Sequence, residues 1–253
     1  MMKRDKTSSQ TFSLKPEYQE VLRNQRVDDN GPGTILHDFE IVLDFVGSQV
    51  IKVSEAYNLL PILLLPELNA RLTHPIQIGI KRPQQKSYPH INGLYLLLRA
   101  TGLAFVEGTG TKQTLVLDEA VLQSWRSLNA TERYCTLLEA WIIRSRPEIV
   151  GEDRGWFDRP LPKCSRFFQQ IPAQGLKIAG NRDWMNELTY DPGFYTLALL
   201  ELYRVLPLTS PNGAIIWLFQ RLSFKMGSTS LRFPWIRKSG DVLPFQRKVI
   251  WTV

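Results

Sequence analysis

The stretch between Lys81 and Lys112 carries residue types that suit contact with a nucleic acid. Arginine pairs well with guanine edges, asparagine and glutamine pair with adenine edges, and lysine neutralises phosphates. From Arg71 to Val106 the sequence has five Lys or Arg residues and no Asp or Glu. The candidate DNA-binding residues are Lys81, Arg82, Gln84, Gln85, Lys86, His90, Asn92, Arg99 and Lys112. This set predicts binding to a polyanion, with double-stranded DNA favoured over RNA.

The charge of the whole chain supports the same class of partner. The 253 residues carry a formal net charge of +7. From Glu201 to Val253 the sequence holds eight Lys or Arg residues against two acidic ones. Clustered positive charge binds polyanions by neutralising phosphates and releasing counterions. The alternative explanation is a basic face that is solvated and has no partner.

Metal and cofactor chemistry has little support in the sequence. No two of the three histidines share the spacing of metal ligands, and the two cysteines do not either. The loop GTGTKQT, from Gly108 to Thr114, lacks the spacing of a phosphate-binding loop. It also joins two predicted strands, whereas a phosphate-binding loop leads into a helix. We therefore expect no metal, no cofactor and no nucleotide site.

The acidic pairs of the sequence fall at predicted turns and helix starts, where helix capping explains them. These pairs are Asp28–Asp29, Asp118–Glu119 and Glu152–Asp153. A nuclease or recombination enzyme would need a carboxylate cluster, and the sequence shows none. We expect no catalytic residue and a protein that is not an enzyme. A catalytic site assembled from residues distant in sequence stays open.

A helix followed by a hairpin must position the candidate residues. Apolar residues recur at helical spacing after Tyr88, and Gly102 stands where a left-handed cap is expected. The runs LAFVEG and QTLVLD are β-rich, and the loop GTGTK joins them. This order is typical of the closing half of a winged helix, whose recognition helix usually enters the major groove. Lys112 would then lie at the tip of the wing.

One property of this helix opposes direct reading of bases. The segment LYLLL is apolar on nearly all sides, as in a buried helix. A recognition helix needs one hydrated face. If the helix is central to the core, the basic loop 81–86 and the hairpin can still touch DNA, but base sequence would be read poorly.

The rest of the chain predicts a mainly α-helical protein with short β-hairpins, an α+β fold. We expect a flexible basic arm at 1–33, a winged-helix-like domain at 34–146, a Pro/Gly-rich connector at 147–182 and a second basic unit of helix plus hairpin at 183–253. Within these units we expect helices at 35–45, after Ser54, in PELNARL, after Asp118, after Asn129 and at 193–206, with a strand in QVIKV and a hairpin at Asn212–Gly213. Asn129 and Glu132 form a capping-box pattern.

Several phrases of the sequence resemble a known family. They are PELNARL, GIKRPQQKSYPHINGLYLLLRATGLAFVEGTG, VLDEAVLQSWRSLNATERYCTLLEAWI and RPEIVGE. Roughly from Asp38 to Glu152 the chain is similar to the Ri-plasmid ORF-three-like proteins of plasmids, mobile elements and bacterial chromosomes. The resemblance implies a similar architecture and a mobile-element context. The family has no established activity, so it implies no site residues. Longer members continue into a C-terminal α/β domain, which we expect this chain to lack.

A second class of function is a protein-interaction or scaffold module of a mobile-element or defence complex. Aromatic residues in the C-terminal third would form a partner surface or a contact between copies of the chain. These residues are Trp217, Phe219, Phe233, Trp235, Phe245 and Trp251. Packing in a core is the favoured explanation of the same residues.

The sequence also predicts where the protein works. No apolar run reaches the ~18 residues of a membrane span, and the basic N-terminus has no apolar core of a secretory signal. Two cysteines give no disulfide framework. We therefore expect a cytoplasmic protein without a membrane partner.

Overall fold

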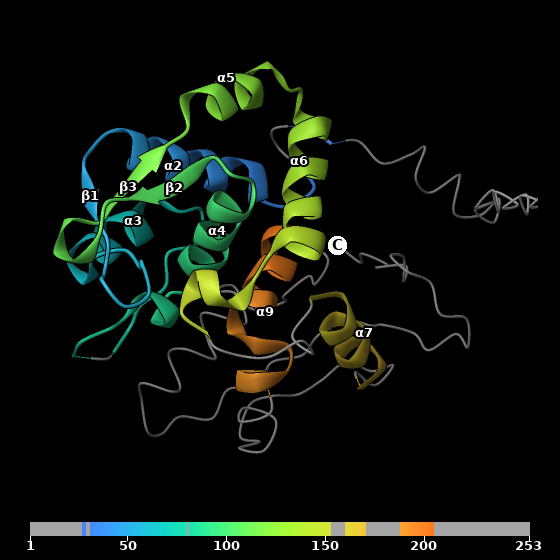
Figure 1. Cartoon of the computed structure of the whole chain (residues 1–253). Helices are drawn as coiled ribbons and strands as arrows, with labels where there is room; N and C mark the ends of the chain where they lie inside the picture. The colour runs from blue at the N-terminus through green and yellow to red at the C-terminus, as the bar shows by residue number, and fades with distance from the viewer. Residues whose placement is uncertain (1–26, 29–30, 80, 153–159, 171–187, 205–253) are drawn as a thin grey trace, which may run out of the picture.

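Helices and a small antiparallel sheet at one side of the molecule make up the computed structural model, which describes residues 27–28, 31–79, 81–152, 160–170 and 188–204 (Figure 1). The main elements are α2 (Ile35–Gly47), β1 (Ile51–Lys52), α3 (Leu65–Arg71), α4 (Pro89–Ala100), β2 (Ala104–Glu107), β3 (Thr114–Leu117), α5 (Glu119–Ser127), α6 (Ala130–Glu139), α7 (Pro160–Gln170) and α9 (Phe194–Leu202). Short helical turns are η1 (Ile62–Leu64), η2 (Gln85–Ser87), η3 (Gly110–Lys112), η4 (Ala140–Arg144), η5 (Pro147–Val150) and η6 (Thr189–Gly193). The described part is mainly helical, which confirms the α+β class.

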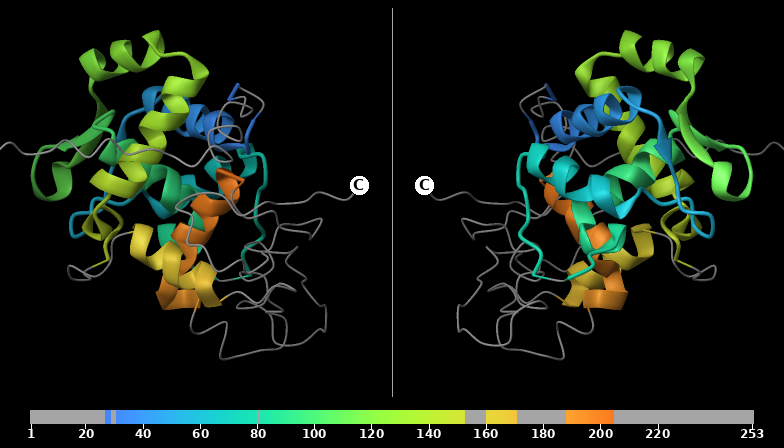
Figure 2. Two further views of the ribbon diagram at one scale, coloured as in Figure 1. Left: turned by 90° about the vertical axis from the view of Figure 1, so that its right-hand side faces the viewer. Right: turned by 90° about the vertical axis from the view of Figure 1, so that its left-hand side faces the viewer.

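Helix α4 is the central element of the core. Its residues from Pro89 to Leu98 are all buried, so it lacks the hydrated face of a surface helix. Helices α2 and α9 and the turns η4 and η5 pack against it. Both views of Figure 2 show α9 lying beside α4. The buried, apolar character predicted for LYLLL is confirmed.

Gly93 lets α9 approach α4 closely. A Cβ atom at this position would lie 2.9 Å from Cγ of Leu199 on α9. Leu199 is fully buried, so it has little room to move aside. The absence of a side chain at one position of α4 therefore sets how close the two helices lie.

The sheet has the strand order β1-β3-β2, and both pairings are antiparallel. In the hairpin, Ala104 lies opposite Leu117 and Val106 lies opposite Leu115. Alternate residues such as Ala104 and Leu115 are buried, so one face of the sheet packs on the core. Gly102 separates α4 from β2 with a φ of 79°, as expected for a left-handed cap. The predicted hairpin is confirmed.

The caps predicted for α5 and α6 are also present. The side chain of Asp118 accepts hydrogen bonds from the backbone N–H groups of Ala120 and Val121, at 3.0 and 3.1 Å. Asn129 and Glu132 form the reciprocal bonds of a capping box, at 2.9 and 3.0 Å. Both helices thus begin where local sequence places them.

The helix predicted after Ser54 is wrong. The Ser54 hydroxyl accepts a hydrogen bond from the backbone N–H of Leu59 at 2.9 Å, and Asn58 adopts a φ of 55°. A left-handed residue ends any helical path, so this segment is a turn. This turn lies alongside α4, because the Tyr95 hydroxyl of α4 donates a hydrogen bond to the Asn58 carbonyl.

The segment expected to be a connector contains a helix, α7, whose Phe167 is buried. Helix α9, expected in a separate second unit, contributes residues such as Leu199 to the same hydrophobic core as α2 and α4.

The predicted arm up to residue 26, the hairpin at Asn212–Gly213 and the C-terminal aromatic residues lie outside the described residues. None of the described helices is long and apolar enough to cross a bilayer.

Candidate nucleic-acid interface

The loop that leads into α4 presents the most accessible part of the predicted interface. Lys81, Arg82, Gln84 and Lys86 are all exposed. The turn η2 fixes the end of this loop: the Gln84 N–H donates to the Ser87 hydroxyl at 3.2 Å, and the Ser87 N–H donates to the Gln84 carbonyl at 2.8 Å. Within the described ranges, the three cations form no ion pair with a carboxylate. Their charges face solvent and are free to meet an anion.

Gln85 has a structural role, and its prediction as a DNA contact is wrong. It is 2% exposed. Its Oε1 accepts a hydrogen bond from the Leu60 N–H at 2.8 Å, and its Nε2 donates to Oδ1 of Asn92 at 2.9 Å. Asn92 is also 2% exposed. Both amides hold the loop and the turn against α4, so neither is presented to an adenine edge.

His90 is likewise internal. Its ring is buried, and Nε2 lies 2.9 Å from Oε2 of Glu201 on α9. This contact ties the start of α4 to the end of α9. Because α9 covers it, His90 does not reach a base edge in this structure, and we remove it from the predicted contacts.

Arg99 is half-buried and supports the turn beside α4. Its Nη1 donates to the Tyr95 hydroxyl at 3.1 Å, and its guanidinium lies 5.9 Å from the centre of the Tyr95 ring. Burial raises the pKa of Tyr95, although Arg99 opposes that rise. The neutral phenol donates a hydrogen bond to the Asn58 carbonyl. Arg99 therefore acts first as a structural partner.

The tip of the hairpin carries Lys112, which is exposed at the end of η3. Gly108 has a φ of 90°, and a Cβ there would lie 2.7 Å from the Lys112 carbonyl oxygen, so the tight turn requires glycine.

Sequence reasoning missed one neighbouring cation. Lys52 on β1 is exposed and pairs with Thr114 at the start of β3, beside the same end of the hairpin. The strand predicted in QVIKV contains Lys52 and is present as β1, but its pairing with β3, whose residues lie far along the chain, could not be predicted from the sequence.

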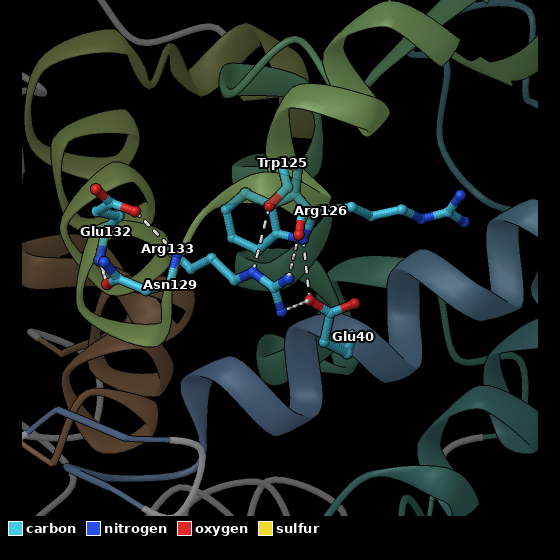
Figure 3. A network of polar contacts seen from close by, with 6 residues as sticks. All are labelled: Glu40, Trp125, Arg126, Asn129, Glu132 and Arg133. Atoms are coloured by element: carbon cyan, nitrogen blue, oxygen red, sulfur yellow. Dashed lines mark hydrogen bonds and ion pairs between the residues drawn. The ribbon is translucent and has the colours of Figure 1, made fainter.

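Other arginines are committed to structure, as Figure 3 shows for Arg133. Its guanidinium donates to the carbonyls of Trp125 and Arg126 at 3.3 and 3.1 Å and to Glu40 Oε1 at 3.3 Å. The Trp125 indole N–H donates to the same Glu40 oxygen at 2.9 Å. Arg133 therefore joins α2, α5 and α6. The Arg126 side chain points away from this cluster.

The described part of the chain is not basic overall. It contains fourteen Lys or Arg and fifteen Asp or Glu, a formal net charge of −1 against +7 for the whole chain. The positive excess belongs to residues outside the described ranges, and residues 205–253 alone hold seven Lys or Arg and one Asp. Any attraction of the described part for an anion must therefore come from local groups such as the loop 81–86.

The described residues also bear on catalytic and metal chemistry. No group of three or more His, Cys, Asp or Glu among them is arranged to hold a metal ion. Burial raises the pKa of the Cys164 thiol to about 12, so this thiol stays protonated and is a poor nucleophile. Neither observation supports a metal-dependent or thiol-based reaction among the described residues.

Comparison with known proteins gives no relative from which a function could be transferred. No family model matches the sequence, and no curated protein or solved structure matches it either. The resemblance to the Ri-plasmid ORF-three-like proteins therefore stays a prediction from the sequence phrases.

Proposed function

We propose that this protein binds nucleic acid, double-stranded DNA in the first place, by contacting the sugar-phosphate backbone. The observation that carries the proposal is the loop before α4, with Lys81, Arg82 and Lys86 exposed and unpaired among the described residues. Phosphate contacts supply affinity and fix the position of a protein on the duplex, without selecting a base sequence. The protein would act without catalysis.

The order of the elements supports a winged-helix-like scaffold for this contact. The chain runs α2, β1, α3, α4, β2 and β3, and the strand order is β1-β3-β2. A winged helix uses a helix followed by a hairpin in this manner, with the wing beside the backbone of the duplex. Lys112 and Lys52 at the hairpin would then meet a second stretch of phosphates.

Because α4 is buried, we do not propose that it reads base edges directly. A recognition helix inserts side chains into the major groove, but α9 covers the side of α4 that carries His90. We therefore propose binding with little preference for base sequence. The positive charge of residues 205–253 supports the same mode, because a basic segment adds phosphate contacts that do not read sequence. The predicted mobile-element setting suits a protein that binds many DNA sequences.

A salt titration of duplex binding tests the proposal. Lys81, Arg82 and Lys86 are changed together to alanine in the full chain. Each lost phosphate contact lowers the slope of log affinity against log salt by about 0.9, so the slope becomes shallower by up to about 2.7. Affinity falls for every duplex sequence tested. Fluorescence anisotropy with labelled duplexes measures both quantities.

A matched variant separates local contact from total charge. Arg126, Arg144 and Arg146 are exposed cations of α5 and of the segment after α6, and changing all three to alanine removes the same charge. We expect this variant to keep most of the slope. Equal losses in the two variants would remove the loop from the interface, and a wild-type chain that binds no duplex at low salt would end the proposal.

A protein-interaction module is the second candidate, and one surface favours it. Phe105 on β2 pairs with Val116 on β3, on the sheet face that does not pack on the core. Val50, which is 80% exposed, precedes β1 and follows the same register. Val116 is half-buried, so these three residues form a partly exposed apolar row, a feature found at contact surfaces. Sedimentation of the full chain and of Phe105→Ser would test it: self-association that the substitution removes, without duplex binding, favours this function.

A further inference from the structure

Two exposed apolar side chains form a tip on the turn η1. Leu63 is 89% exposed and Ile62 is 47% exposed, whereas Leu60 and Leu65 on either side of them are buried. Pro61 begins the turn, and the Leu64 N–H donates to its carbonyl at 3.0 Å. Leu60 and Leu65 pack in the core and fix the turn between them. Ile62 and Leu63 therefore face solvent. We name these two residues the apolar tip.

The apolar tip is anchored to the basic loop. The Leu60 N–H donates to Oε1 of Gln85 at 2.8 Å in a buried hydrogen bond. Successive Cα atoms are about 3.8 Å apart, so the Cα of Leu63 lies at most about 11 Å from that of Leu60. Lys86 directly follows Gln85 in the chain. Figure 1 shows the segment after β1 and the loop before α4 on the same side of the molecule.

The charges near the tip favour an anionic partner. Lys81, Arg82 and Lys86 face solvent without an ion pair among the described residues, while Glu67 on α3 is paired with Arg71 at 2.5 Å. The partner that fits this combination has negative charge on its outside and apolar surface that a leucine can reach. A DNA duplex has both, because stacked bases lie behind its phosphates. Apolar side chains inserted between base steps from the minor groove bend DNA in this way.

We propose that Leu63, with Ile62 beside it, is a wedge that inserts between base pairs in the minor groove and bends the duplex. Lys81, Arg82 and Lys86 bind the phosphates next to the opened step. This inference rests on the proposed function and adds a mechanism to it, since a wedge needs no exposed recognition helix. The wedge reads no base edge and adds only an indirect preference, for flexible pyrimidine–purine steps that unstack at a lower cost.

The test measures bending and affinity on the same duplex. A short duplex carrying a dye at each end reports its bend by energy transfer, and the full chain is compared with Leu63→Ser. Wild type brings the dyes closer together. Leu63→Ser binds about tenfold more weakly, because binding no longer buries the apolar surface of a leucine. The dyes return to the spacing of free DNA. Because Leu63 is 89% exposed, the substitution leaves the fold intact, and a thermal melt checks this.

Ile143→Ser provides the matched control. Ile143 is 73% exposed and belongs to η4, a different element of the fold. It should bind and bend the duplex as wild type does. The inference holds if Leu63→Ser loses the bend and Ile143→Ser keeps it.

Three other results would overturn the inference, and they are distinguishable from one another. If wild type and Leu63→Ser bind equally and leave the duplex straight, the wedge fails while backbone binding stands. If wild type binds no duplex at low salt, the proposed function and the wedge fail together. A chain that binds anionic phospholipid vesicles through Leu63 and does not bend DNA would assign the apolar tip to a membrane surface, which also overturns the wedge.

Discussion

The arginines in the described part of the chain include some that hold the fold and some that face solvent. Arg133 donates to two carbonyls and one carboxylate, and thereby fixes α5 and α6 against α2 (Figure 3). Arg126, which lies seven positions earlier in the chain on α5, extends its side chain away from the same cluster. Residue type alone does not separate these roles, because the partners of Arg133 lie on two other helices, α2 and α5.

Arg133→Ala is therefore expected to lower the free energy of unfolding by about 2–3 kcal/mol. The substitution removes hydrogen bonds from a charged donor and leaves the Trp125 carbonyl and Glu40 with fewer partners. Arg126→Ala is the control and should change stability by less than about 0.5 kcal/mol, as for an exposed side chain. Urea unfolding of both variants measures the difference, and equal stabilities would show that the cluster contributes little.

The polar residues of the loop and of α4 show where sequence reasoning stopped. Gln85, His90 and Asn92 have the types that read bases, but the structure uses all three internally. Asn92 and Gln85 bond to each other, and His90 meets Glu201, which is 111 positions away in the chain. A polar residue on a buried helix needs such a partner. The spacing of one stretch cannot show that partner, whereas the apolar pattern LYLLL did indicate that the helix is buried.

At the scale of elements, local signals predicted much of the fold. The helix stop at Gly102, the hairpin at 104–117 and the caps at Asp118 and Asn129 all depend on neighbours within a few positions, and they are present. The helix after Ser54 failed because the same hydroxyl that caps helices also closes turns, here by accepting from the Leu59 N–H. The packing of α9 on α4 depends on residues a hundred positions apart and was not predicted.

The α4–α9 contact gives a prediction at this scale. Gly93→Ala should lower the free energy of unfolding by about 1–3 kcal/mol, because the new methyl group would lie 2.9 Å from Leu199 Cγ. Alanine is otherwise favoured over glycine in a helix, so destabilisation here reports the close approach. Thermal or urea unfolding measures the change.

A double-mutant cycle with Leu199→Ala isolates the contact. Shortening Leu199 removes the atom that the new methyl group meets, so Gly93→Ala should cost less in that background than in wild type. If Gly93→Ala stabilises the protein, or costs the same in both backgrounds, then α4 and α9 do not pack as closely as the structure has them.

At the scale of the whole molecule, charge and burial constrain how DNA could be held. The described part has a net charge of −1, and the exposed cations that stand beside the proposed interface are those of the loop 81–86 and of the end of the hairpin. Residues 205–253 carry a much larger positive charge per residue. We therefore expect the basic C-terminal segment to add affinity, while the loop and the apolar tip determine how the duplex lies against the described part.

The central claim is that the duplex meets the loop 81–86 and the hairpin tip while α4 stays covered by α9. Hydrogen–deuterium exchange of the full chain, with and without a short duplex, tests it most directly. We predict slower exchange at 81–88 and 108–113 when duplex is bound, with exchange in α4 and α9 unchanged. Protection confined to other segments, or faster exchange in α9 as it moves to uncover α4, would contradict the account.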